Sequence, residues 1–498
     1  MYFYILTLLV GLCGASSHLN KRSEEFAIDR YNFPYVPFDI GESYGGLLPV
    51  SSNPNDTQKL YFWFSPSENP EASEDITIWL NGGPGCSSLI GLLQENGNFL
   101  WQAGTAQPVA NPWAWTKLTN MVWIDQPVGA GFSQGEPTAY GSDDTADQFL
   151  GFWKNFIDTF NLTGRSVYIT GESYAGKYIP YIAEAMLNAN DTEPGYYNVQ
   201  GTMLIDPAIG PDVVLVEIPM LNYVENNQAF LRLNSTFKDE MRIAHRDQYN
   251  YSSFFETYFK FPTAGPMPTR PDIDEGSSPF RNYVTEAAAL INPCFNVYHI
   301  TDTCPSLYDP LQTLSSADTS LGGYFNQTEV QQAMNAPRVS YSTCAPRSVF
   351  VDDSATGGPG NGGDLAPPAS FAALPAVFDR VPLNLVLNGA LDMLIPSVGT
   401  LFALQNVTWR GATGFSAEPT QTFIVPPAGG DAGLTGQAGE MGTWAYERGV
   451  VFVDVAGAGH ELPEYNPSAA FRLLEVMLGR VGVEEGLGQG VDWTTPLE

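Results

Sequence analysis

The chain has 498 residues, of which 44% are hydrophobic and 15% charged, so it carries ample apolar material for a large folded core. Acidic residues outnumber basic ones by 54 to 22, which gives a formal net charge of −32 at pH 7. Because phosphate binding needs clustered Lys and Arg, nucleic acid is excluded as an expected partner. The acidity suits an acidic working environment, where protonation of carboxylates relieves self-repulsion.

The N-terminal segment has the pattern of a secretory signal. An apolar run is followed by small residues suited to cleavage, so residues 1–17 are predicted to be a signal peptide. The dibasic pair Lys21-Arg22 follows, and residues 18–22 are predicted to be a short pro-segment that ends with it. The apolar run is too short to span a bilayer, so no membrane anchor is expected.

The cysteines and glycosylation sequons favour the same secretory route. Four cysteines lie beyond the predicted signal, and they can be joined into two disulfides in three ways. We expect both disulfides to form, because the protein would fold in an oxidising compartment. We therefore predict a secreted or vacuolar protein, as a monomer or a homodimer. The cysteines are Cys86, Cys294, Cys304 and Cys344, and the N-x-S/T asparagines are Asn55, Asn161, Asn190, Asn234, Asn250, Asn326 and Asn406.

Strand-like runs alternate with helical periodicity along much of the chain. Apolar residues recur at helical spacing over 143–160 and 467–478. This alternation predicts a mostly parallel α/β sheet flanked by helices. The expected strands cover residues 60–64, 76–80, 120–124, 166–170, 201–205, 383–387 and 449–455.

Two regions differ from this pattern. Residues 211–340 are rich in Tyr, Phe and Asn with helix-like patches, and are predicted to be an inserted, mainly helical cap. Residues 356–369 are rich in Gly and Pro and are predicted to be a loop. The catalytic core is then expected to comprise residues 23–210 and 341–498.

The strand at 166–170 runs into Gly171-Glu172-Ser173-Tyr174-Ala175, and a helix is expected to follow. This strand–turn–helix pattern predicts a nucleophile elbow, the signature of the α/β-hydrolase fold, with Ser173 as the nucleophile. The tight turn needs small neighbours, which Gly171 and Ala175 provide. An ordinary βα turn is the alternative.

A serine hydroxyl needs a base to take its proton. In this fold the order is Ser, then the acid, then His. His460 lies in a glycine-rich loop after a strand, the position expected of that base, whereas His245 and His299 lie in the predicted cap. Asp392 follows the strand at 383–387 and is predicted to orient His460. Asp454 lies within a strand, and Asp206 ends the strand after the elbow helix, so both are less suitable as the acid.

Four segments resemble the signatures of the serine carboxypeptidase family, in the family's order, and the resemblance covers residues 31–478. They are 79–89 (WLNGGPGCSSL), 125–133 (DQPVGAGFS), 171–178 (GESYAGKY) and 457–460 (GAGH). The resemblance implies a serine-type carboxypeptidase that releases single residues from peptide C-termini through an acyl-enzyme. It also implies that the disulfides pair Cys86 with Cys344 and Cys294 with Cys304.

The resemblance further implies roles for individual residues. The backbone N–H groups of Gly83 and Tyr174 would form the oxyanion hole, and Asn81, Gly82 and Glu172 would hold the substrate's C-terminal carboxylate, supported by Glu95 and Trp79. Because two facing carboxylates repel, a proton must be shared between Glu172 and the substrate, which would favour binding at acid pH. Glu461 is either a determinant of preference for basic residues or a solvent-facing side chain.

Departures from the family pattern concern specificity more than chemistry. The family usually carries an Ile-Gly-Asn-Gly type run where residues 205–210 read IDPAIG, and the loop at 356–369 resembles an insertion. An acyltransferase of the same fold and a catalytically inactive secreted homologue remain as alternatives. No metal or cofactor signature is present, since the four histidines have no paired spacing.

Overall fold

The computed structural model describes residues 20–69, 72, 74–269, 279–311, 323–351 and 359–488. The predicted signal peptide, residues 1–17, lies outside them, as do the start of the pro-segment and part of the Gly/Pro loop. Lys21 and Arg22 are exposed, and the Arg22 guanidinium donates a 3.1 Å hydrogen bond to the carbonyl oxygen of Asp158 near the end of α1 (Ser142–Phe160). The dibasic pair is thus held on the surface beside that helix.

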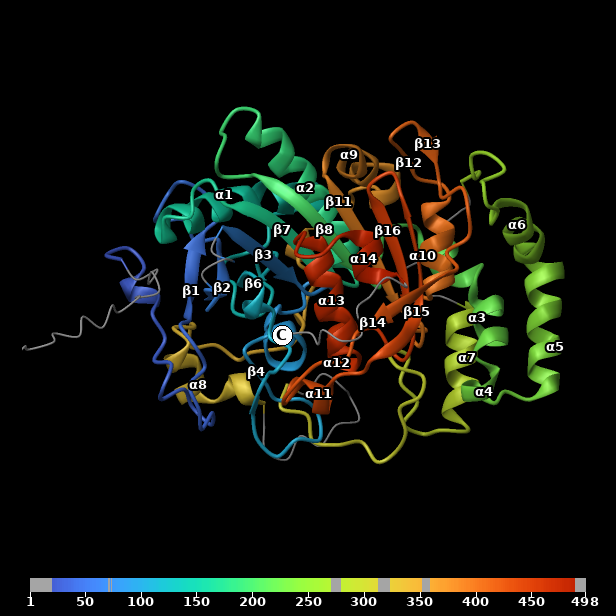
Figure 1. Ribbon diagram of the computed structural model, residues 1–498, viewed down its shortest axis with the longest axis horizontal. Helices are drawn as coiled ribbons and strands as arrows, with labels where there is room; N and C mark the ends of the chain where they lie inside the picture. The colour runs from blue at the N-terminus through green and yellow to red at the C-terminus, as the bar shows by residue number, and fades with distance from the viewer. Residues whose placement is uncertain are drawn as a thin grey trace, which may run out of the picture.

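A ten-stranded sheet forms the centre of the molecule (Figure 1). Six neighbouring strands, β6 to β16 in the order given below, run parallel, and antiparallel strands extend both edges. The predicted α/β class is confirmed, and each of the seven expected strands overlaps one that is present. In sheet order the strands are β1 (Tyr44–Pro49), β2 (Lys59–Ser65), β6 (Asn120–Asp125), β3 (Asp75–Leu80), β7 (Ser166–Glu172), β8 (Val199–Ile205), β11 (Leu383–Gly389), β16 (Val450–Val455), β15 (Gly439–Glu447) and β14 (Gln421–Val425).

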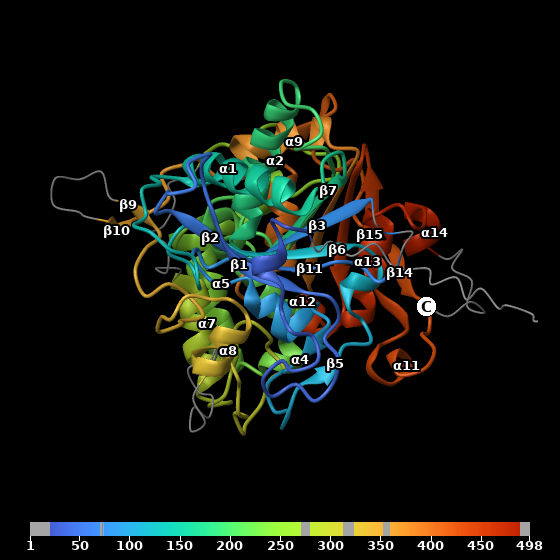
Figure 2. The same cartoon turned by 90° about the vertical axis from the view of Figure 1, so that its left-hand side faces the viewer.

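Helices cover both faces of this sheet (Figures 1 and 2). One face carries α1, α2 (Ala175–Asn190) and α9 (Ala373–Arg380), and the other carries α13 (Pro467–Met477) and α14 (Val483–Leu487). Strand residues alternate between the two layers: Phe62 and Ile78 pack with the first set of helices, Trp63 and Trp79 with the second. This period of two places apolar side chains on both faces, as a sheet buried on both sides requires.

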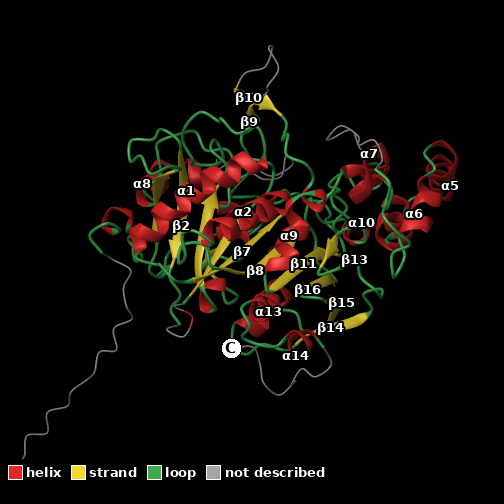
Figure 3. Cartoon of the chain, turned by 90° about the horizontal axis from the view of Figure 1, so that it is seen from above, coloured by secondary structure: helices red, strands yellow, loops and turns green. Residues whose placement is uncertain are grey.

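The helices of the predicted cap do not form one unit. Helices α3 to α7 gather at one end of the molecule, whereas α8 lies toward the other end, near β1 (Figures 1 and 3). The Tyr61 hydroxyl on β2 donates a 2.7 Å hydrogen bond to the carbonyl oxygen of Met334, directly after α8. The helices are α3 (Met220–Asn226), α4 (Gln228–Leu231), α5 (Ser235–Ile243), α6 (Tyr251–Tyr258), α7 (Pro279–Ala289) and α8 (Thr328–Ala333).

The remaining elements are short. The described part of the predicted Gly/Pro loop includes β10, which pairs with β9 in a small hairpin projecting from the body (Figure 3). The elements are β4 (Phe99–Leu100), β5 (Val109–Ala110), β9 (Phe350–Val351), β10 (Pro359–Gly362), α10 (Ser397–Leu404), β12 (Thr408–Trp409), β13 (Ala412–Thr413), α11 (Ala432–Thr435) and α12 (Leu462–Tyr465).

Candidate active site

Ser173 occupies the turn between the central strand β7 and helix α2. Its φ of 61° is in the left-handed region, which a non-glycine residue adopts only where surrounding contacts fix it. Its backbone N–H donates a 2.9 Å hydrogen bond to Ile205 on β8. A Cβ on Gly171 would lie 2.1 Å from the Leu80 carbonyl oxygen, so the strand can enter the turn only with glycine at this position. These are the features of a nucleophile elbow.

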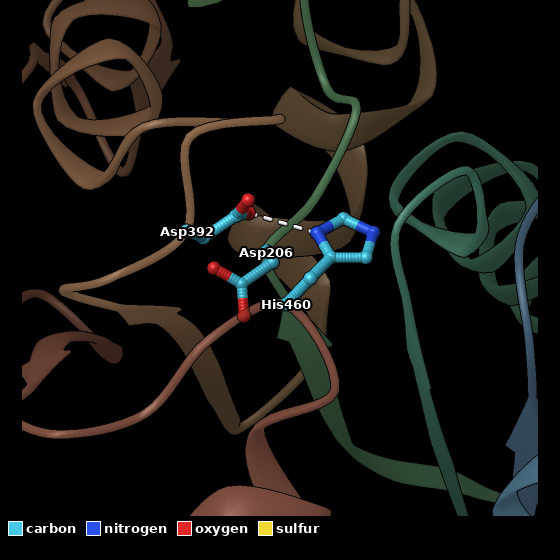
Figure 4. A group of neighbouring side chains, drawn as sticks. All are labelled: Asp206, Asp392 and His460. Carbon is cyan, nitrogen blue, oxygen red and sulfur yellow. Dashed lines mark hydrogen bonds and ion pairs between the residues drawn. The ribbon is translucent and has the colours of Figure 1, made fainter. Parts of the chain in front are cut away.

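Asp392 and His460 come together from the loops that follow β11 and β16. The His460 Nδ1 lies 2.8 Å from Asp392 Oδ2, and both side chains are almost fully buried (Figure 4). The same carboxylate accepts backbone hydrogen bonds from Leu394 at 2.7 Å and Ile395 at 3.2 Å. These bonds orient the carboxylate toward the imidazole.

The second ring nitrogen of His460 is unengaged. Its Nε2 is buried and has no hydrogen-bond partner among the described residues, so no hydrogen bond joins it to Ser173. Burial lowers the pKa of His460, but the neighbouring Asp392 outweighs it and the net pKa is raised. An imidazole with one nitrogen fixed by a carboxylate and the other free has the form of a general base.

A second carboxylate, Asp206, lies at the same place, directly after β8. One carboxylate oxygen of Asp206, one of Asp392 and one ring nitrogen of His460 lie within 4.8 Å of one another (Figure 4). Asp454, also considered as the acid from the sequence, lies within β16, and burial raises its pKa to about 6. The carboxylate bonded to the imidazole is that of Asp392.

The turn at Gly82 and Gly83 packs against the backbone of the elbow. A Cβ on Gly82 would lie 2.4 Å from the Tyr174 nitrogen, and Gly83 has a φ of 113°. Gly82, the residue before Gly83, therefore lies against the N–H of Tyr174, which brings this turn to the place where a two-donor oxyanion hole is expected. A disulfide joins Cys86 to Cys344, the pair that the resemblance implies, and the Cys86 N–H donates to the Gly82 carbonyl oxygen at 3.1 Å.

Three polar residues named from the sequence form one buried cluster beside the elbow. The side-chain amide of Asn81 donates to Glu172 at 2.6 Å and to Glu95 at 3.3 Å. The side-chain Oδ1 of Asn81 accepts hydrogen bonds from the Trp79 indole at 2.8 Å and from the Gly91 backbone N–H at 3.1 Å. Both lone pairs of that oxygen face donors, so the amide nitrogen is fixed toward the two carboxyl groups.

The two glutamates of this cluster favour their protonated forms. Burial first, and then the charges of Glu95 and Glu461, raise the pKa of Glu172 well above its usual range. Burial and Glu461 raise the pKa of Glu95 to about 8. Each has a buried Oε2 with no hydrogen-bond partner in the described part of the chain. Two neighbouring carboxyl groups in a low-dielectric site titrate as a pair and retain a proton at neutral pH.

Two further acids extend this cluster. Glu461 is half-buried, and its negative charge contributes to raising the pKa values of His460, Glu95 and Glu172. Glu464 on α12 has its pKa raised well above the usual range by burial and then by Glu461 and Glu95. Sequence reasoning missed Glu464. Its position three residues after Glu461, on a short helix opened by a proline, is the signal that could have found it.

A second disulfide, Cys294–Cys304, closes a ten-residue loop next to the two catalytic loops. The carbonyl oxygen of Tyr298 accepts a hydrogen bond from the backbone N–H of His460 at 2.7 Å. The carbonyl oxygen of Val297 accepts one from the backbone N–H of Met393 at 2.9 Å. The Tyr298 ring meets the His460 ring edge-on at 5.0 Å. The sequence places this loop in the predicted cap. In the structure it contacts both the segment that carries Asp392 and the segment that carries His460.

The other histidines and the sequon asparagines lie elsewhere. His245 is buried in the helical region, where its ring nitrogens contact Ile218 and Ser252, and the ring of His299 stacks on Tyr465. The sequon asparagines are exposed or half-exposed, although the amide of Asn326 donates to the Tyr341 carbonyl oxygen at 2.9 Å. Glycosylation of these sites stays a prediction.

No helix in the described part of the chain is long and apolar enough to cross a membrane. A profile of the Peptidase S10 family, described as serine carboxypeptidase, matches residues 34–480. A "probable serine carboxypeptidase" of Arthroderma benhamiae is 45% identical over 481 residues, covering 94% of this chain and 88% of the relative. "Serine-type carboxypeptidase F" of Aspergillus niger is 39% identical over 483 residues, covering 93% and 88%.

Among solved structures, KEX1(delta)p, a prohormone-processing carboxypeptidase from Saccharomyces cerevisiae, superposes with a TM-score of 0.72. The sequences are 21% identical, and the match covers 92% of this chain and 96% of the other. At this identity the comparison shows a shared fold.

Proposed function

Because the chain belongs to the serine carboxypeptidase family, a family of hydrolases, we propose that Ser173, Asp392 and His460 are its catalytic triad and that peptide C-termini are its substrates. The observation that carries this proposal is the cluster of Asn81, Glu172 and Glu95, buried directly beside the elbow. A general esterase has no use for a carboxylate-binding group at this position. A carboxypeptidase needs one.

In the first half-reaction, the Ser173 hydroxyl oxygen attacks the carbonyl carbon of the last peptide bond. The Nε2 atom of His460, which has no hydrogen-bond partner among the described residues, takes the serine proton and then passes it to the leaving amine of the terminal residue. The negative charge that develops on the carbonyl oxygen meets the N–H groups of Gly83 and Tyr174. Water, deprotonated by His460, then hydrolyses the acyl-enzyme and restores Ser173.

The carboxylate of the departing residue would be bound by the Asn81 amide, the Gly82 N–H and the protonated Glu172, which together form a carboxylate clamp. Glu172 is adjacent to Ser173 in the sequence, so a carboxylate bound there places the last peptide bond at the nucleophile. Selection of free C-termini then follows from the distance between clamp and nucleophile. Peptides with an amidated C-terminus lose the charge-assisted hydrogen bonds, which are about twice as strong as neutral ones.

The same cluster gives a reason for an acid optimum. Glu172 and Glu95 repel a bound carboxylate once they lose their shared proton, so substrate binding weakens as the pH rises toward about 8. The net charge of −32 and two disulfides suit an acidic, oxidising compartment. We therefore propose a secretory-pathway protein, either exported or held in a vacuole, with Lys21-Arg22 as an accessible processing site.

The test is release of the terminal amino acid from N-blocked dipeptides between pH 4 and 7, with a Ser173→Ala variant as control. Release at acid pH that is lost in the variant supports the proposal. If a fluorophosphonate labels Ser173 but no amino acid is released, acyl transfer to another acceptor replaces hydrolysis as the function. If neither occurs, the chain is an inactive homologue.

A further inference from the structure

Asp206 is a buried acid that the mechanism above does not use. It follows β8 with a φ of 43°, in the left-handed region, and its backbone N–H donates a 2.8 Å hydrogen bond to Leu387 on β11. Its side chain has no exposed surface. A non-glycine residue in this conformation, with a charged side chain out of reach of water, persists only where neighbouring contacts hold it.

Hydrogen bonds connect Asp206 to the end of β11, the strand that precedes the Asp392 loop. Its Oδ1 atom accepts the Gly389 N–H at 2.9 Å and the Asn388 side-chain amide at 3.1 Å, both at the end of β11. Its Oδ2 atom is buried and has no hydrogen-bond partner in the described structure. One oxygen of the Asp206 carboxylate lies within 4.8 Å of an oxygen of Asp392 and of a ring nitrogen of His460 (Figure 4).

Two carboxylates this close in a dry site do not both ionise. Asp392 is the better anion, because it accepts two backbone N–H bonds and faces the His460 ring. Asp206 has donors on Oδ1 alone, so a proton on Oδ2 would give the unpartnered atom a hydrogen bond to make. Burial first, and then the charge of Asp392, raise the pKa of Asp206 well above its usual range.

The surrounding groups do not supply a counter-charge. Tyr223 of α3 faces the same carboxylates with a buried hydroxyl group that has no hydrogen-bond partner, and Asp454 adds a further acid. Among the described residues, neither Lys nor Arg forms an ion pair with Asp206 or Asp392. Asp206 and Asp392 are the two acids grouped with the His460 imidazole, which is therefore the cation that they act on.

We propose that Asp206 is a positioning residue of the triad, whose carboxyl group donates a hydrogen bond from Oδ2 to the Asp392 carboxylate. This bond holds Asp392 against His460 and disperses part of its negative charge. A less concentrated charge binds the imidazole proton less tightly, so His460 is neutral, and able to act as a base, at lower pH. The inference rests on the proposed function, because it gives the family's triad a device for working in acid.

Two substitutions separate this role from a purely structural one. Asp206→Asn preserves the size of the side chain and can donate from its amide nitrogen to Asp392. The acid limb of the pH profile, where kcat falls as His460 becomes protonated, should therefore lie at the same pH as in the wild-type protein. Asp206→Gly relieves the positive φ and removes the donor. It should lower kcat by about tenfold and move the acid limb up by about half a pH unit.

Asp454→Asn is the matched control, because Asp454 is a half-buried acid on β16 that has no hydrogen bond to His460 in the described structure; it should leave the acid limb unchanged. Thermal unfolding of each variant establishes that it is folded. A shift of the acid limb to lower pH in Asp206→Asn would show that Asp206 carries a negative charge, and an unchanged profile in Asp206→Gly would show no action on the triad. Either result overturns the inference, whereas an inactive wild-type protein would refute the proposed function instead.

Discussion

Asn81 donates a 2.6 Å hydrogen bond to Glu172, a residue 91 positions away in the chain and adjacent to the proposed nucleophile. The parallel pairing of β3 with β7 creates this contact, because both strands end at the same edge of the sheet. The hydrogen bond ties the carboxylate-binding cluster to the elbow.

Glu172→Gln should remove most of the pH dependence of substrate binding. In the wild-type protein, loss of the proton shared by Glu172 and Glu95 makes the clamp repel the substrate carboxylate, so KM should rise between neutral pH and pH 8. Glutamine donates a hydrogen bond at every pH. KM measured from pH 4 to 8 checks this, with Glu475→Gln as control, since Glu475 pairs with Arg472 on α13. An unchanged pH profile in Glu172→Gln would show that the residue is only a spacer.

Asp392→Asn should reduce kcat about ten-thousandfold while KM changes little. The amide would offer its N–H or its oxygen to His460 Nδ1 without a charge to stabilise the imidazolium, and the ring would no longer be fixed in the productive tautomer. Steady-state kinetics on an N-blocked dipeptide measure both constants. A loss smaller than about tenfold would assign the acid to another residue.

Gly82→Ala should lower kcat by at least about a hundredfold, the usual effect of losing an oxyanion donor. The added methyl group would lie 2.4 Å from the Tyr174 nitrogen, so the turn carrying Gly83 must move away from the elbow. Gly363→Ala is the matched control, because no atom of the described residues lies within 4 Å of the Cβ it would add. Equal activity of the two variants would mean that this turn does not contribute to catalysis.

Replacing Cys294 and Cys304 together by serine should lower kcat by roughly tenfold to a hundredfold, the scale of loss expected when catalytic groups are misplaced by about 1 Å. The loop that they close hydrogen-bonds the His460 N–H through Tyr298. KM for the terminal carboxylate should change less, since Asn81 and Glu172 lie on other segments. Full activity of the double variant would show that the loop holds His460 without its disulfide.

The protein should become less stable as the pH rises from about 4.5 to 8. Glu95 has its folded-state pKa raised to about 8, and that of Glu464 is also raised, so over this range the folded state binds more protons than the unfolded state. The free energy of unfolding then falls with pH, by about 1.4 kcal/mol per unit for each such proton. The raised pKa of His460 acts in the same direction above its unfolded value. Thermal midpoints at pH 5 and 8 check this, and Glu95→Gln should reduce the difference. A midpoint that increases with pH would contradict it.

The sheet could be predicted where strands are buried on both faces. The run at 76–80 has no exposed residue in the structure, and such apolar runs are recognisable without knowing their neighbours. Strands β14 and β15 were missed because they lie at an antiparallel edge and are partly exposed, with a register shift between Thr422 and Ile424. The contact of Met334 with Tyr61 on β2 could not be predicted, because local sequence does not show which distant strand the end of the predicted cap meets.

For the site, motifs predicted which residues take part, but not which of them touch. Ser173 and His460 follow from local strand-turn patterns. The contact of Asp206 with Asn388 joins residues 182 positions apart and depends on β8 lying next to β11, an order that is set by the whole sheet. For this reason the sequence indicates Asp206 only as an alternative to Asp392 and does not predict that the two lie together.

A carboxylate clamp beside Ser173 is proposed to restrict the enzyme to free C-termini. The most direct measurement uses one peptide in two forms, a free acid and a C-terminal amide, mixed in equal amounts with the wild-type protein at pH 5 and followed by mass spectrometry. We predict stepwise loss of single residues from the free acid, with the amide cleaved far more slowly. Equal consumption of the two forms, or cleavage within the peptide, would contradict the claim.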